Sequence, residues 1–226
     1  LPKLSQKDML SSIILELKKQ GPFEPKEVYY DFKIVSEMSD RTGPKVHVLV
    51  AIAKKQVIDQ KIELLNQIGM KTIGVSILQT AFLNIMQKLK VLLEGETVAI
   101  LDIGAKFTNM HFVRSGVIDF SRDIATAGDH ITQSMVRTIT LPDKEMVINL
   151  EEAERIKKEC VIPKKDEIEE KVGVLTKAHI LSMLRPLLES MVAEIQRSIN
   201  YYRQTYNVMK IDRIFLVGGG SRLKNL

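Results

Sequence analysis

The sequence predicts an α/β protein in which a small α+β module precedes a larger domain of mixed sheet and helices. Two nearly continuous apolar runs, 46–53 and 97–101, have the length and composition of buried strands. Apolar residues recur at helical spacing through 177–206 and predict one long helix. With 226 residues, 45% of them hydrophobic, the chain can bury one large core or two modest ones.

Residues 1–77 form the predicted small module, and residues 78–96 connect it to the rest of the chain. Its helices follow from apolar residues three and four positions apart, and its strands from short apolar runs bounded by glycine and proline. The predicted elements are, in order, a helix at 5–20, a hairpin of strands at 28–35 and 46–53 with a turn at Gly43-Pro44, a helix at 55–68, a strand at 72–77 and a helix at 79–93. The last helix should direct apolar side chains, Ile85 and Leu89 among them, toward a core.

Residues 97–226 form the predicted larger domain, which opens with three strands in succession and therefore with a meander. Pro186 lies inside the long helix and predicts a kink there or two abutting helices. The predicted elements are, in order, strands at 97–101, 108–113 and 117–122 with tight turns at 102–104 and 114–116, helices at 129–139 and 150–159, a charged loop at 163–170, a helix at 177–206, a strand at 213–217 and a helix that starts at Ser221.

Composition argues against several classes of protein. The single cysteine, Cys160, has no second thiol for an internal disulfide and fits a reducing compartment. No apolar run approaches the roughly 20 residues needed to cross a bilayer, and the first residues lack a signal-peptide pattern. The net charge of +5 is scattered among acidic residues, so we expect no nucleic-acid partner. The histidines, at 47, 111, 130 and 179, share no metal-ligand spacing.

A first candidate site is a hairpin in which an acid ends a buried strand and small residues allow a sharp turn. Backbone N–H groups of the turn and the Thr108 hydroxyl suit phosphate oxygens, while Asp102 suits Mg²⁺ held through water. The residues concerned are Asp102, Gly104, Ala105, Lys106 and Thr108. The pattern D-x-G-x-x-x-T is also typical of an ordinary hairpin with an acid in the turn, so alone it is weak.

Two further segments are candidates. In Gly218-Gly219-Gly220-Ser221 a buried strand runs into three glycines and a predicted helix start, which suits close approach of a sugar or a phosphate but also describes a flexible turn. Glu154 and Lys157 lie one helical turn apart and could contact a ribose and a base, although such a pair is usually a solvated surface pair.

In this order, the three segments resemble the second major domain of the superfamily of actin, heat-shock chaperones and sugar kinases. The resemblance implies that the hairpin is a phosphate motif and the glycine run an adenosine motif. It also implies that Glu154 and Lys157 contact ribose and adenine, with ATP and Mg²⁺ as ligands. Gln79 begins a helix near the place where actin-type proteins hold a water-positioning residue, but a solvated glutamine at a helix start is the commoner case.

Within that superfamily the chain resembles the PilM family of type IV pilus assembly, which is related to FtsA. The resemblance extends over essentially the whole chain, and its main stretches are Val28–Asp31, Val48–Ala53, Ile68–Met70, Ala99–Ala105, Ser121–Ile124 and Glu194–Tyr202. It implies an α/β, actin-like (ribonuclease H-like) ATPase domain preceded by the inserted α+β module, with the N-terminal part of the first actin-like domain outside this chain. Lys106 and Phe107 occupy a turn that is usually smaller, and Gly128-Asp129 stands where the family has Gly-Gly.

The resemblance implies a cytoplasmic ATP-binding scaffold at the inner-membrane face. Such a protein holds the N-terminal segment of a PilN-type inner-membrane partner, contacts other pilus assembly proteins and reaches the membrane through its partner. Residues 1–77 would supply one wall of the partner cleft, and nucleotide would act as a switch, with weak or absent hydrolysis. An FtsA-like division or cytoskeletal filament protein is the alternative, and self-association stays open. A phosphotransferase of the sugar-kinase branch finds no support in the sequence.

Overall fold

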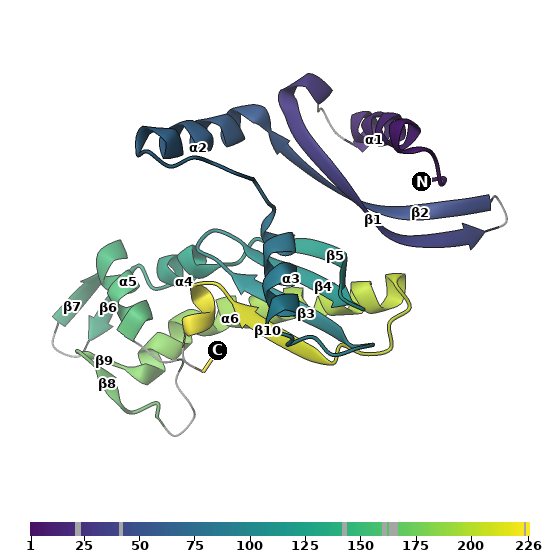
Figure 1. Cartoon of the computed structure of the whole chain (residues 1–226). Helices are drawn as coiled ribbons and strands as arrows, with labels where there is room; N and C mark the ends of the chain where they lie inside the picture. The colour runs from purple at the N-terminus through teal and green to yellow at the C-terminus, as the bar shows by residue number, and fades with distance from the viewer. Residues whose placement is uncertain (21–23, 41–42, 142–143, 160–161, 163–166, 224) are drawn as a thin grey trace. The chain divides into compact units, whose positions relative to one another are not determined.

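The computed structural model describes residues 1–20, 24–40, 43–141, 144–159, 162, 167–223 and 225–226. The chain divides into two compact units, residues 1–85 and 86–226 (Figure 1). Cys160 lies outside the described residues, as do residues 163–166 of the predicted charged loop. None of the described helices is long and apolar enough to cross a membrane.

The first unit is built on a long antiparallel ribbon of two strands, β1 (Val28–Asp40) and β2 (Gly43–Lys54), so the predicted hairpin is confirmed. Helix α1 (Gln6–Gln20) packs on one face of the ribbon, where Met9 and Ile13 meet Val46 in a buried core. A 3-10 turn (η1, Pro25–Glu27) leads into β1, and helix α2 (Lys55–Gln67) follows β2 directly.

Four predictions for residues 43–93 were wrong. Gly43 and Pro44 are not the turn but the first residues of β2, paired with Asp40 and Ser39. Residues 72–77 form no strand, because no described residue pairs with their backbone and a strand needs a neighbour for its hydrogen bonds. The predicted helix 79–93 is shorter: α3 covers Leu78–Lys88, and Lys90 takes a left-handed conformation with φ 54°. Two of its predicted core residues are mostly exposed, Ile85 at 54% and Leu89 at 66%.

The second unit contains a four-stranded sheet in the order β10-β3-β4-β5. The strands are β3 (Thr97–Ile103), β4 (Thr108–Arg114), β5 (Val117–Ile124) and β10 (Arg213–Val217). The first three form the predicted antiparallel meander, and β10 lies parallel to β3. Asp102 and Ile103 belong to β3, so the predicted turn at 102–104 is displaced to the residues that follow.

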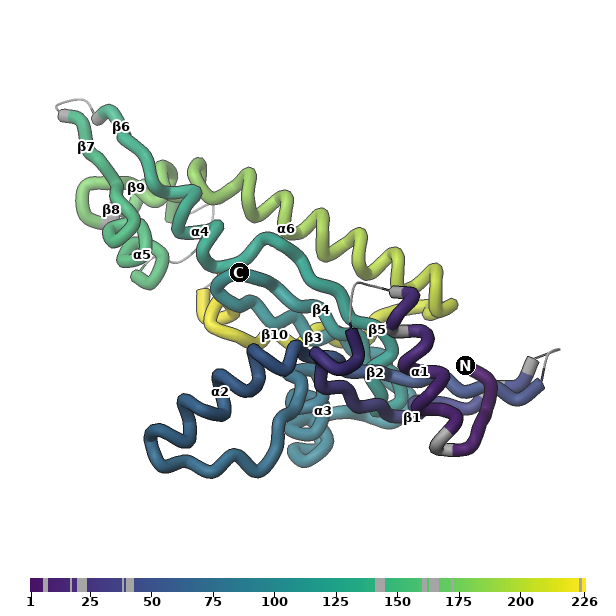
Figure 2. Tube along the Cα trace, turned by 90° about the horizontal axis from the view of Figure 1, so that it is seen from above, coloured from purple at the N-terminus to yellow at the C-terminus, as the bar shows by residue number. Residues whose placement is uncertain are grey.

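Helix α6 (Lys177–Thr205) runs along one face of this sheet (Figure 2). It is continuous through Pro186, so the alternative of two separate helices was wrong. Its residues Met191 and Tyr202 pack on Leu101 and Phe112 of the sheet, and the Tyr202 hydroxyl donates to the carboxylate of Asp119 over 2.8 Å. The second half of the predicted apolar stripe therefore faces the sheet.

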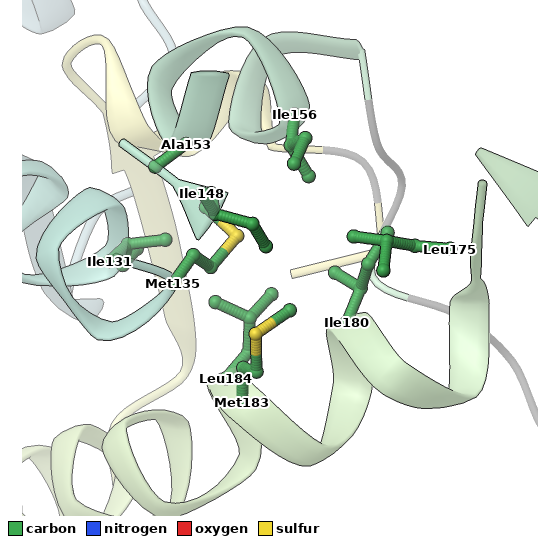
Figure 3. Close-up of a cluster of buried hydrophobic side chains, with 9 residues drawn as sticks. All are labelled: Ile131, Met135, Ile148, Ala153, Ile156, Leu175, Ile180, Met183 and Leu184. Carbon is green, nitrogen blue, oxygen red and sulfur yellow. The ribbon is translucent and has the colours of Figure 1, made fainter. Parts of the chain in front are cut away.

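A second core lies between the first half of α6 and a group of short elements (Figure 3). These elements are α4 (Gly128–Ser134), β6 (Arg137–Leu141), β7 (Lys144–Ile148), α5 (Leu150–Glu159), β8 (Lys171–Val172) and β9 (Leu175–Thr176). The predicted helix 129–139 was half wrong: its second part, rich in β-branched residues, pairs with β7 as a hairpin. The predicted terminal helix is a 3-10 turn, η2 (Gly220–Arg222).

Candidate functional site

The turn between β3 and β4 follows Asp102, whose side chain is 8% exposed. The Gly104 N–H donates to the carbonyl of Phe107 over 3.0 Å and closes the turn. Ala105, Lys106 and Phe107 are exposed at its tip. At its base the Thr108 hydroxyl, buried, donates to the carbonyl of Thr126 over 2.7 Å and so fixes the start of β4.

The glycine run at the end of β10 lies directly against Asp102. A Cβ placed on Gly218 would stand 2.3 Å from Asp102 Oδ1 and 2.6 Å from the Ile103 carbonyl oxygen, and Gly218 itself has φ +83°. A Cβ on Gly220 would stand 2.2 Å from the side chain of Ile103. Only glycine fits at these two positions. The two predicted loops meet here because β10 and β3 are parallel neighbours, so that both strands end at the same edge of the sheet. Ser221 donates its hydroxyl to the Gly218 carbonyl over 2.7 Å.

The start of α4 is bound to the same turn. The Gly128 N–H donates to the Gly104 carbonyl over 3.0 Å, and the Asp129 N–H donates to the Ala105 carbonyl over 2.7 Å. A Cβ on Gly128 would stand 3.1 Å from the Gly104 carbonyl oxygen, which leaves little room for a side chain. Asp129 is exposed, so its side chain leaves this backbone contact undisturbed.

Glu154 and Lys157 of α5 form an ion pair of 2.6 Å that is bonded to α4. The Thr132 hydroxyl donates to Glu154 Oε2 over 2.6 Å, and Lys157 Nζ donates to Thr132 Oγ1 over 2.7 Å and to the Gly128 carbonyl over 3.3 Å. Burial raises the pKa of the Glu154 carboxyl, but hydrogen bonds from Lys157 and Thr132 outweigh it, so that pKa lies below its ordinary value. The ion pair thus links α5 to α4 through hydrogen bonds and is not a solvated surface pair.

The structure brings Asp102, the turn and the glycine run together, and joins Glu154 and Lys157 to them through α4. Gln79 belongs to the first unit. Gly128 and Thr132 were missed as members of this group, because only the packing of α4 on α5 shows their contacts. Among the described residues no group of three histidine, cysteine, aspartate or glutamate side chains could hold a metal ion. Asp102 is the carboxylate that the end of β3 places beside this turn.

The family model of the type IV pilus assembly protein PilM matches residues 2–226. The chain belongs to the PilM family. This confirms the resemblance inferred from the sequence.

Solved structures show the fold to which this family member belongs. A chain of a PilM–PilN type IV pilus biogenesis complex superposes with a TM-score of 0.77 at 23% identity; it is matched over 100% of this chain and 59% of its own length. MreB5 of Spiroplasma citri bound to AMPPNP has a TM-score of 0.55 at 16% identity, covering 76% and 56% of the two chains. The MamK filament protein has a TM-score of 0.52 at 16% identity, covering 76% and 54%. The predicted actin-like α/β fold is confirmed.

Gly218→Ala should destabilise the second unit by at least about 2 kcal/mol, because the new Cβ overlaps Asp102 and the left-handed backbone disfavours alanine. Gly219→Ala is the matched control, since no atom lies within 4 Å of its added Cβ and its φ is −64°. Urea unfolding of both variants measures the difference. Equal stabilities would contradict the close contact.

Lys157→Met should lower stability at pH 7 by about 1–2 kcal/mol, because Thr132, Glu154 and the Gly128 carbonyl lose a shared donor. Glu154 has a lowered pKa in the folded state, so its contribution is complete above its unfolded pKa and is lost as pH falls through the folded value. The cost of Lys157→Met should therefore shrink below about pH 4. Lys158→Met, at a 72% exposed side chain, is the control and should cost little. A loss of unfolding free energy in Lys157→Met that does not change with pH would argue against the ion pair as its source.

Proposed function

We propose that the second unit binds ATP with Mg²⁺ where the β3–β4 turn meets the glycine run. The observation that carries this proposal is the contact between Gly218 and Asp102, which sets two loops with unused backbone donors side by side. Among the described residues, the N–H groups of Ala105, Lys106 and Gly219 donate to no partner. Such groups, held near a single carboxylate, suit phosphate oxygens and a hydrated Mg²⁺.

Most of the predicted residues would have a direct role at this site. Gly104, Ala105, Lys106 and Thr108 would shape the phosphate turn, and Asp102 would hold Mg²⁺ through water. Glu154 would accept from ribose hydroxyls, with Lys157 beside the base. Mg²⁺, when bound, neutralises phosphate charge. The Lys157 ammonium group already contacts Glu154, Thr132 and the Gly128 carbonyl. Lys157 would therefore contact the adenine base by packing its methylene chain against it.

The protein would act as a nucleotide-dependent scaffold of type IV pilus assembly, with weak or absent hydrolysis. A ligand shifts a conformational equilibrium only by its differential affinity for the two states, so ATP would need to bind one arrangement of the protein better than another. Gln79 stays a proposal for water positioning. The family membership favours this role over that of an FtsA-like filament protein.

A groove in the first unit supports a partner site. It has a volume of about 540 Å³ and is bounded by the ribbon, by α2 and by the segment before α3. Its floor includes Leu49 and Ala51, and its walls include Ile62, Val75 and Ile77. Apolar walls with a few polar groups suit an extended peptide with alternating apolar side chains.

We infer that this groove contributes to binding the N-terminal segment of a PilN-type inner-membrane protein. The support is the family membership and the likeness to a chain from a PilM–PilN complex. The partner would bring the scaffold to the cytoplasmic face of the inner membrane, beside other pilus assembly proteins.

Asp102→Asn should weaken binding of ATP in the presence of Mg²⁺ by about tenfold or more, because the hydrated ion loses its carboxylate. Binding in EDTA should change much less. Asp129→Asn, an exposed acid at the start of α4, is the matched control and should bind normally. Isothermal titration of the intact protein measures all three. Unchanged Mg²⁺-dependent affinity in Asp102→Asn would refute this assignment.

Ile62→Asp should weaken binding of the partner's N-terminal peptide by more than about tenfold, because a charge replaces an apolar wall of the groove. Leu64→Asp, on the same helix but 61% exposed and outside the groove, should bind as the wild type does. Fluorescence anisotropy with a labelled peptide gives both affinities. Repeating the titration with ATP tests the switch, since coupling must be reciprocal. Equal losses in both variants would place the peptide elsewhere.

A further inference from the structure

One face of the sheet, opposite the face covered by α6, carries several polar side chains beside Asp102 that the nucleotide proposal does not use. The strand register sets Asp102 opposite Asn109, and Asn109 opposite Asp123. Two residues further along β4 on the same face lies His111, which is paired with Ser121 of β5. Since direct and diagonal neighbours on one face lie within about 8 Å, these side chains form one cluster.

His111 is the most buried polar member of this cluster, with 1% of its surface exposed. Its Nδ1 lies 3.0 Å from the Ser121 hydroxyl oxygen. Its Nε2 is buried and has no hydrogen-bond partner among the described residues. An unpaired buried polar atom is destabilising, so such an atom calls for a physical explanation.

The charge state of His111 limits what Nε2 can do. Burial lowers the pKa of His111, while the charges of Asp102 and Asp123 oppose that shift. The ring is therefore neutral near pH 7 and carries one N–H. A hydroxyl can rotate to donate, so Ser121 can supply the proton for Nδ1 and leave the ring's own N–H on Nε2. That N–H is then a donor without a partner among the described residues, on the face of the sheet that carries Asp102.

We propose that His111 is a positioning residue for Asp102, with its Nε2–H donating through a buried water to the Asp102 carboxylate. The inference rests on the proposed nucleotide site. No described residue donates a hydrogen bond to that carboxylate, although its side chain is only 8% exposed. A donor from the sheet face would fix the orientation of the acid and leave its other oxygen for a hydrated Mg²⁺.

The simpler alternative is that His111 only joins β4 to β5 through Ser121. Two substitutions separate the alternatives, because the amide nitrogen of asparagine stands near the place of Nδ1 and that of glutamine near the place of Nε2. If His111 positions Asp102, His111→Gln keeps the essential donor and His111→Asn loses it. If His111 only bonds Ser121, the order is reversed.

Isothermal titration of the intact protein with ATP, with Mg²⁺ and in EDTA, tests the proposal. We expect His111→Asn to lose about tenfold in affinity with Mg²⁺ and less than about twofold in EDTA. His111→Gln and the control Asp129→Asn should both stay within about threefold of the wild type. Equal affinities in His111→Asn and the wild type, or a larger loss in His111→Gln, would overturn the positioning role while leaving the nucleotide site intact. A wild type that binds no ATP would overturn both.

A second measurement does not depend on how the variants fold. Imidazole ¹⁵N chemical shifts of the wild type identify the tautomer, and we expect the proton on Nε2 in the nucleotide-free protein. Asp102→Asn should move the Nε2 resonance, whereas Asp129→Asn should not. A proton on Nδ1 would mean that the ring donates to Ser121, which would contradict the proposal.

Discussion

The close contact between the glycine run and the end of β3 is the constraint on which the candidate site depends. Gly218 and Gly220 have no space for a Cβ, since Asp102 and Ile103 occupy it. This contact requires β10 to lie parallel to β3, and a parallel neighbour can be reached only by a long crossover connection. Helix α6 supplies that crossover. Its 29 residues extend about 43 Å and return the chain along the sheet.

The turn after Asp102 also supports structure on its other side. Its carbonyl groups accept from the first N–H groups of α4, and α4 is bonded to α5 through Thr132, Glu154 and Lys157. A movement of the turn therefore changes the position of α4, and with it the ion pair on α5. The residues that would hold phosphate and those that would hold ribose belong to one hydrogen-bonded system rather than to separate sites.

Local patterns predicted much of this arrangement. The strands β3, β4, β5 and β10 and the helices α5 and α6 were found because each is marked by a strong apolar period or run. The failures are segments whose state depends on a distant neighbour. Residues 72–77 have the composition of a strand but pair with no strand among the described residues. Residues 137–139 were included in a predicted helix, but they form part of β6 because they pair with β7. Asp102 and the glycine run were found from motifs, whereas the contacts of Thr132 depend on how α4 crosses α5.

The strand that carries the glycine run is also bound at its other end. Arg213 begins β10, pairs with Glu96 over 2.5 Å and donates to the Val91 carbonyl over 2.6 Å, in the segment that follows α3. The Arg213 guanidinium lowers the pKa of the Glu96 carboxyl, which therefore stays charged near neutral pH. Arg213 lies five positions before Gly218, about 17 Å away along β10. Because a paired strand is stiff along its length, a displacement of the α3 connection would be transmitted to the glycine run.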